Sequence, residues 1–266
     1  MPELFFILTC LCLGLLSGFL GGLLGIGGGV VIVPGLLALF AATNRFGDGS
    51  ATLVAIGTSL AVIVFTSISA TRAQIRAGNI LWPVFQRWVV WLVAGALGAG
   101  YAAAALGPTM LRGFIGLFLF CVGLIMLTQW RPAPHRGLPG RLSAPGIAAA
   151  AGMVSGLAGI GGGNVIVPTL SYCNVPIHKA TATASAFGIP IAAAGAVGYS
   201  LQGSWTPSLL GMIYLPAVAG IALTAVVAAP LGVRAAQLIE PSRLKRYFGV
   251  LLLLVAARML WSAFIR

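Results

Sequence analysis

Two runs of three consecutive glycines are the residues of this chain whose type and spacing best suit chemistry. They are Gly27, Gly28 and Gly29 in the first half, and Gly161, Gly162 and Gly163 in the second. Glycine leaves the backbone N–H groups uncovered, and N–H groups next to the start of a helix attract anions. We therefore expect the two runs to face each other and to line a binding site for a small anion.

Six polar side chains within apolar segments are candidates to donate further hydrogen bonds to this anion. They are Thr58, Ser59, Asn164, Thr181, Thr183 and Ser185. Thr58 and Thr183 are favoured because they occupy matching positions of an internal repeat, and Asn164 directly follows the second glycine run. An alternative is that the Ser and Thr hydroxyls bond to carbonyl groups of their own helices.

Other kinds of chemistry lack the residues they need. The three acidic residues, Glu3, Asp48 and Glu240, all fall at the ends of apolar segments. The carboxylates of a proton relay or a cation site are therefore absent from the segment interiors. His135 and His178 lack the Cys, Ser or Asp partners of a metal or nucleophile site. We expect no metal, no cofactor and no enzyme activity.

The composition predicts an integral membrane protein. Hydrophobic residues make up 59% of the 266 residues and charged residues only 7%, whereas an ordinary soluble domain has about 25% charged residues. Several apolar segments reach the ~20 residues that cross a bilayer. The expected partners are therefore the lipid bilayer and a small anion, without nucleic acid. A homo-oligomer is compatible with this interpretation.

One stretch of the sequence occurs twice. Residues 18–36 and 152–170 are identical at 13 of 19 aligned positions. Ala55–Thr58 then matches Ala180–Thr183, Gly95 matches Gly220 at the same offset as this pair, and Pro108 matches Pro241 farther on. Such halves, each interrupted by Gly and Pro, are typical of transporters.

Each half contains five apolar segments. They are Leu4–Leu24, Val30–Thr43, Ser50–Thr71, Val84–Leu106 and Met110–Trp130, then Pro145–Ile160, Val165–Cys173, Ala180–Tyr199, Pro207–Val233 and Leu244–Phe264. We expect a first transmembrane repeat over residues 1–130, a cytoplasmic connector over 131–144 and a second transmembrane repeat over 145–266.

The placement of Lys and Arg predicts the topology. With five crossings in each half, eleven basic residues fall on one side and three on the other, and the richer side is expected to be cytoplasmic. Both termini then lie outside the cytoplasm, in the inner (plasma) membrane of a bacterium. Because five is odd, the second half is inverted relative to the first. The expected fold is an all-α integral membrane protein of two inverted repeats with Gly/Pro-broken or re-entrant helices.

The segments after the glycine runs are too short to cross a membrane comfortably. Pro suits the first turn of a helix, and β-branched residues suit extended backbone. We therefore expect Gly25–Val33 and Gly159–Val167 to be unwound, with helices that begin near Pro34 and Pro168. The alternative is that small residues spaced four apart only let helices pack closely, and this is the favoured interpretation for the glycines before Gly25.

A Gly-x-Gly-Gly-Gly-x-x-x-x-Pro-x-Leu motif occurs at Gly25–Leu36 and again at Gly159–Leu170. Together with the Ala-x-Gly-Thr-Ser element at Ala55–Ser59, it resembles the TauE/SafE sulfite-exporter family of membrane permeases. The resemblance covers nearly the whole chain. In the second half, Ala182 and Ala184 replace Gly57 and Ser59, so unequal roles for the two copies of this element are expected.

The resemblance implies a secondary transporter that exports a small anion by alternating access. The anions it implies are sulfite, a sulfonate, or a related organosulfur or carboxylate anion. An anion channel with the same inverted repeats is the alternative, and saturable counterflow in liposomes would distinguish a carrier from it.

Overall fold

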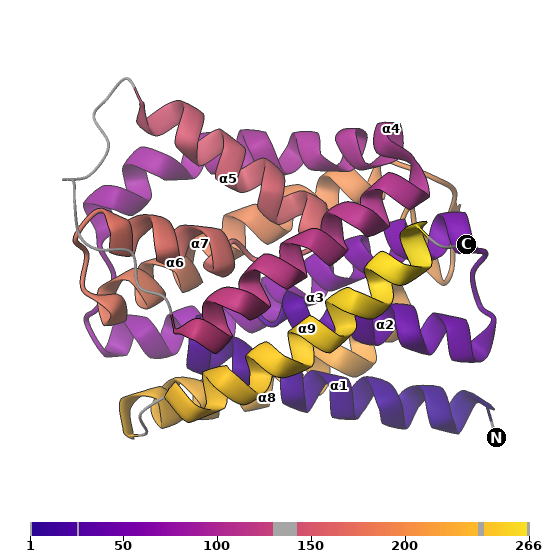
Figure 1. The fold of residues 1–266 in the computed structure, drawn as a ribbon, viewed down its shortest axis with the longest axis horizontal. Coiled ribbons are helices and arrows are strands. Elements are labelled where there is room, and N and C mark those ends of the chain that lie inside the picture. The colour runs from indigo at the N-terminus through magenta and orange to yellow at the C-terminus, as the bar shows by residue number, and fades with distance from the viewer. Residues whose placement is uncertain (1, 26, 130–142, 239–241, 265–266) are drawn as a thin grey trace.

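The fold is taken from a computed structural model, which describes residues 2–25, 27–129, 143–238 and 242–264 (Figure 1). The described helices are α1 (Pro2–Leu24), α2 (Gly29–Thr43), α3 (Asp48–Arg76), α4 (Trp82–Thr128), α5 (Ala144–Ala158), α6 (Gly163–Tyr172), α7 (Ile177–Ser200), α8 (Leu215–Leu238) and α9 (Ser242–Phe264). Three strands, β1 (Trp205–Thr206), β2 (Leu209–Leu210) and β3 (Ile213–Tyr214), lie between α7 and α8. The predicted connector over 131–144 falls outside the described residues, apart from its last two positions.

Among the described residues, five helices are long and apolar enough to cross a membrane: α1, α3, α4, α7 and α8. Helix α4 accounts for two of the predicted segments, because its backbone leaves the helical conformation at Gly107 (φ 73°, ψ 163°). Pro108 follows this glycine and cannot donate a helical hydrogen bond. The chain is therefore a mostly helical multi-pass membrane protein.

The expectation of long unwound segments after the glycine runs is wrong. Helices α2 and α6 begin at Gly29 and Gly163, so the valines and isoleucines before Pro34 and Pro168 are helical. Only residues 25–28 separate α1 from α2, and only residues 159–162 separate α5 from α6. Ile26 lies outside the described residues. Burial explains the difference, since Val30, Ile32 and Val33 are at most 1% exposed and packing overrides the β preference of such residues.

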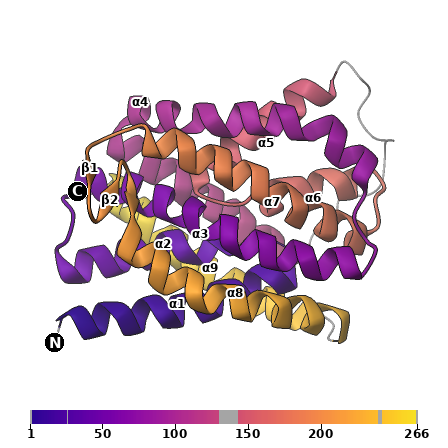
Figure 2. The ribbon, with the colours of Figure 1, turned by 180° about the vertical axis from the view of Figure 1, so that it is seen from behind.

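The expectation of an all-α protein is wrong for the segment before α8. The predicted span over Pro207–Val233 begins later, at Leu215, and the residues before it form the antiparallel strands β1, β2 and β3. Figure 2 shows β1 and β2 at the same end of the molecule as the start of α1. Gly203 (φ 80°) and Gly211 (φ 60°) adopt left-handed conformations in this segment, which glycine reaches without strain.

The most extensive helix contacts join the two halves of the chain. Helix α1 packs on α8, α5 packs on α4, α3 packs on α7, and α4 packs on α9. In the repeat, α1 corresponds to α5, α3 to α7, and the first and second parts of α4 to α8 and α9. This correspondence converts the pair of α1 and α8 into the pair of α5 and α4. It converts each of the other two pairs into itself.

Glycines permit two of these pairs. A methyl group on Gly22 would lie 2.0 Å from the carbonyl oxygen of Ala229, and one on Gly152 would lie 2.1 Å from that of Leu92. Small residues at a helix interface let the two backbones approach this closely. The closeness of these contacts fits the packing interpretation of the glycines before Gly25.

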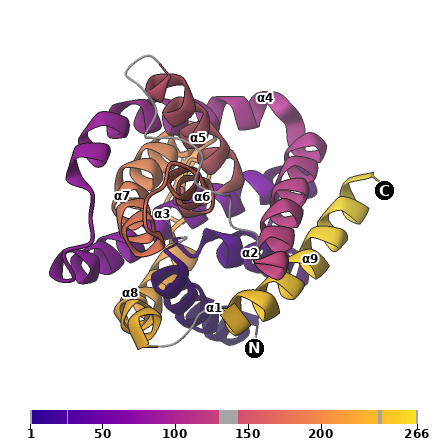
Figure 3. The same cartoon turned by 60° about the vertical axis from the view of Figure 1, so that its left-hand side comes forward.

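The first helices of the two halves run in opposite directions. In Figure 1, α1 runs from right to left and its counterpart α5 runs from left to right. The start of α1 and the end of α9 lie at one end of the molecule, and α5 begins at the opposite end. Figure 3, turned by 60°, shows α6 in the middle of the view, with α5 above it and α7 beside it. The glycine loops that precede α2 and α6 lie against each other, since Gly27 approaches Gly161.

Candidate functional site

The two glycine loops contact each other at the centre of the molecule. A methyl group on Gly27 would lie 3.3 Å from the Cα atom of Gly161 and 3.3 Å from Cγ2 of Ile63. Ile63 lies near the middle of α3, about 20 Å from either end of that helix at 1.5 Å per residue. This contact agrees with the expectation that the two runs face each other.

The loops have matching backbone conformations at two of their glycine pairs, whereas Gly27 has φ of 72° and its counterpart Gly161 lies outside the left-handed region. Gly25 and Gly159 both have φ of 69°, and Gly28 and Gly162 have φ of 77° and 84°. All four lie in the left-handed region, where a residue with a Cβ is strained. Gly28 and Gly162 cap the N-termini of α2 and α6, so these two short helices begin directly at the point where the loops meet.

A cavity lies beside the point of contact. Its lining comes from both halves: Gly21, Gly22, Gly25, Gly27, Thr66, Ser67, Ala70, Gly161, Ala184, Ser185, Gly188 and Ala229. The described lining contains only glycine, alanine, serine and threonine, so none of these residues brings a charged side chain to the space. Its free volume of about 10 Å³ holds about one water molecule in this conformation.

The cavity occupies only one side of the contact. Along α3 it lies between Ile63 and the end of the helix at Arg76. In the aligned repeat, the counterparts of Ser185 and Gly188 are Leu60 and Ile63, which are large and fully buried. A methyl group on Gly195 would lie 2.8 Å from Cδ1 of Leu60. Apolar side chains therefore fill the equivalent space toward the start of α3.

The structure gives Thr58 and Thr183 matching backbone partners. The N–H of Tyr214 donates to Oγ1 of Thr58 (2.9 Å), and the N–H of Leu81 donates to Oγ1 of Thr183 (3.0 Å). Both threonines are fully buried, and neither lines the cavity. Each one fixes the residue that directly precedes a long helix, α8 or α4.

These two bonds also correct the alignment of the repeat. Leu81 corresponds to Tyr214, so Trp82–Pro83 corresponds to Leu215–Pro216. The predicted match of Gly95 with Gly220 is wrong, because the loop that contains β1, β2 and β3 adds residues to the second half only.

The remaining predicted residues have different surroundings. Ser59 donates a hydrogen bond from Oγ to the carbonyl oxygen of Gly159 (2.8 Å) and so ties α3 to the second loop. Among the described residues, the buried side-chain amide nitrogen of Asn164 has no hydrogen-bond partner. It therefore remains a free donor close to the start of α6. A role for either residue in binding stays a prediction.

The prediction of the site missed two cavity-lining hydroxyls, those of Thr66 and Ser67. Both occur in an apolar segment, as Thr58 does, and both lie about one helical turn beyond Ile63. The same signal that singled out Thr58 could have found them. Thr66 and Ser67 were missed because the prediction favoured polar residues at matching positions of the two halves. Their counterparts, Ile191 and Ala192, are apolar.

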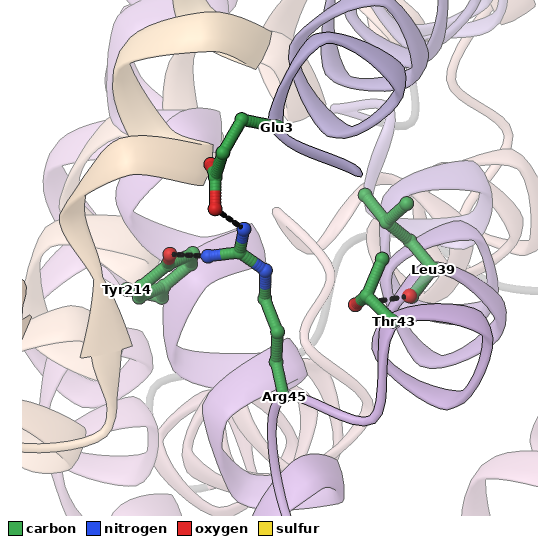
Figure 4. A network of polar contacts seen from close by, with 5 residues as sticks. All are labelled: Glu3, Leu39, Thr43, Arg45 and Tyr214. Carbon is green, nitrogen blue, oxygen red and sulfur yellow. Dashed lines mark hydrogen bonds and ion pairs between the residues drawn. The ribbon is translucent and has the colours of Figure 1, made fainter. Parts of the chain in front are cut away.

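A second polar cluster lies at the end of the molecule where α1 begins (Figure 4). The guanidinium of Arg45 donates hydrogen bonds to the carboxylate of Glu3 and to the hydroxyl of Tyr214, and it lies 4.5 Å from the ring centroid of Phe6. Burial is the largest effect and disfavours the charge of Arg45, but the hydrogen bonds and charge interactions with Glu3 and Tyr214 together outweigh it, so the pKa of Arg45 lies above its ordinary value. The cluster connects three segments that are distant in the sequence.

Comparisons with known proteins agree with this architecture. The family profile described as "Sulfite exporter TauE/SafE" matches residues 10–259. A "Probable membrane transporter protein" of Haemophilus influenzae is 32% identical over 259 residues, which cover 96% of this chain and 98% of that protein. The "Probable membrane transporter protein YunE" of Bacillus subtilis is 31% identical over 211 residues, covering 72% of this chain and 77% of that protein. No solved structure matches the chain significantly.

Proposed function

Because the chain belongs to the sulfite exporter TauE/SafE family of membrane transporters, and not to a family of enzymes, we propose that it carries a small anion such as sulfite or a sulfonate out of the cell. The observation that carries the proposal is the contact of the two glycine loops beside a cavity. Irregular backbone at membrane depth is tolerated where it lines such a cavity.

The anion is proposed to bind against Gly27 and Gly161, which line the cavity. The helices α2 and α6 begin beside the cavity, so the positive ends of both helices lie near the proposed anion. The residues that form these two helix starts are Gly28 and Gly29, and Gly162 and Gly163. The side-chain amide of Asn164 is proposed as a further hydrogen-bond donor to the anion. Thr58, Ser59 and Thr183 are assigned a supporting role instead, because their hydroxyls already bond to backbone groups.

Alternating access between two inverted repeats is the proposed mechanism. The opposite directions of α1 and α5 and the exchangeable helix pairs support inverted repeats over residues 1–130 and 145–266. The cavity extends toward the Arg76 end of α3, which the distribution of basic residues predicts to be cytoplasmic, and Leu60 and Ile63 fill the opposite side. A path that is packed on one side supports a carrier over an open channel.

Both termini are proposed to lie outside the cytoplasm. In a variant without the four native cysteines, a cysteine introduced at residue 2 should react with a membrane-impermeant thiol reagent in intact cells. A cysteine introduced at position 78, between α3 and α4, should react only after the cells are opened. The reverse pattern would show that the orientation is wrong.

A thermal-shift titration of the detergent-purified protein tests the function. Sulfite, thiosulfate and small sulfonates should raise the unfolding temperature in a saturable way, because a ligand that binds only the folded state stabilises it. Equal concentrations of a neutral solute such as glycerol serve as the control. A protein that no anion stabilises would contradict the proposal.

A further inference from the structure

The cavity has one hydroxyl group that the protein itself does not use. Of the three hydroxyls in the lining, that of Thr66 donates to the carbonyl oxygen of Ile63 (3.2 Å) and that of Ser185 donates to the carbonyl oxygen of Thr181 (3.0 Å). The hydroxyl of Ser67 makes no hydrogen bond to the described residues, although the side chain is only 3% exposed. Its oxygen therefore stays available to a water molecule or to a ligand in the cavity.

The neighbours of Ser67 keep this hydroxyl uncovered. A methyl group on Gly188 would lie 2.5 Å from Oγ of Ser67 and 3.3 Å from the carbonyl oxygen of Gly161. Because residue 188 has no side chain, the hydroxyl shares the cavity with the second glycine loop. The counterpart of Ser67 in the other half is Ala192, so the repeat does not supply a second hydroxyl of this kind.

The lining also limits the charge of the ligand. The described residues that line the cavity include no Lys, Arg or His, so they offer only neutral donors to replace the water around a bound ion. The hydration free energy that an ion loses on burial grows with the square of its charge, and burying an unpaired charge is already costly. A singly charged anion therefore suits the cavity better than a doubly charged anion of the same size.

We propose that the Ser67 hydroxyl donates a hydrogen bond to a small, singly charged oxyanion bound against Gly27 and Gly161. Hydrogensulfite and short sulfonates belong to this class. The proposal rests on the proposed function, and it adds a binding residue and a preference for charge.

Methanesulfonate and sulfate are suitable probes, because both are tetrahedral and of similar size but carry one and two negative charges. Thermal-shift titrations of the full-length protein should give tighter binding of methanesulfonate than of sulfate. Ser67→Ala should weaken methanesulfonate binding about ten-fold or more, as expected for the loss of a hydrogen bond to a charged group. Ser69→Ala is the matched control, since the Ser69 hydroxyl bonds to the carbonyl oxygen of Val226 on the adjacent α8, and it should bind methanesulfonate like the wild type.

Each other outcome has a distinct meaning. Unchanged methanesulfonate affinity in Ser67→Ala would overturn the role of Ser67. Equal affinity of the wild type for sulfate and methanesulfonate would overturn the charge preference. If Ser67→Ala is too unstable to purify, Ser67→Cys keeps the size of the side chain with a weaker donor, and it should still lose affinity. A wild type that binds neither these anions nor sulfite would instead contradict the proposed function itself.

Discussion

Replacing Gly27 by alanine is expected to abolish anion transport while the protein still folds and inserts. The added methyl group would lie 3.3 Å from the Cα atom and 3.4 Å from the backbone nitrogen of Gly161. It would occupy the space where the two loops meet and cover the N–H group of the second loop. We expect anion affinity to fall at least ten-fold, measured by thermal-shift titration, and transport by proteoliposomes to fall to background.

Gly78→Ala is the matched control for this variant. Gly78 has φ of 68° and Gly27 has φ of 72°, so alanine costs each site about 1–2 kcal/mol of backbone strain. Nothing lies within 4 Å of a methyl group on Gly78, and we expect this variant to transport normally. If both variants lose the same stability and Gly27→Ala keeps its anion affinity, the contact of the loops is structural only.

A second large effect is expected at Gly152, where α5 packs on α4. The methyl group of Gly152→Ala would lie 2.1 Å from the carbonyl oxygen of Leu92, a distance that no contact between these atoms tolerates. The two helices must separate, because a backbone oxygen cannot rotate away as a side chain can. We expect destabilisation at or above the upper end of the ~1–3 kcal/mol typical of overpacking, measured as thermal unfolding in detergent.

Gly146→Ala, on the same helix, separates packing from helix propensity. Gly146 is exposed and has nothing within 4 Å of an added methyl group. The substitution should leave the unfolding temperature unchanged or raise it slightly, since alanine favours helix over glycine. Equal destabilisation by the two substitutions would show that the close approach of α5 and α4 is wrong.

The sequence alone was sufficient to predict the class of protein and the meeting of the glycine loops. Low charge and long apolar segments indicate a membrane protein whatever the details of packing. The doubled motif places Gly27 and Gly161 at matching positions, which predicts that they face each other. The contact between them follows from the internal repeat.

Details that depend on packing could not be predicted in this way. The β-branched residues Val30–Val33 suit extended backbone locally, but burial in the core keeps them helical. Thr58 and Thr183 match each other, but their shared role is to accept N–H groups ahead of α8 and α4. Ser67 has no polar counterpart, so a search for matching residues passes over it.

Counterflow in proteoliposomes tests the central claim most directly. Vesicles loaded with unlabelled sulfite and diluted into medium with a trace of ³⁵S-sulfite should accumulate the label transiently above its external concentration, and the initial rate should saturate with internal sulfite. Vesicles that contain Gly27→Ala should behave like protein-free vesicles. Accumulation that does not saturate would indicate a channel, and uptake equal to that of protein-free vesicles, for sulfite and for methanesulfonate alike, would contradict the assignment as a small-anion carrier.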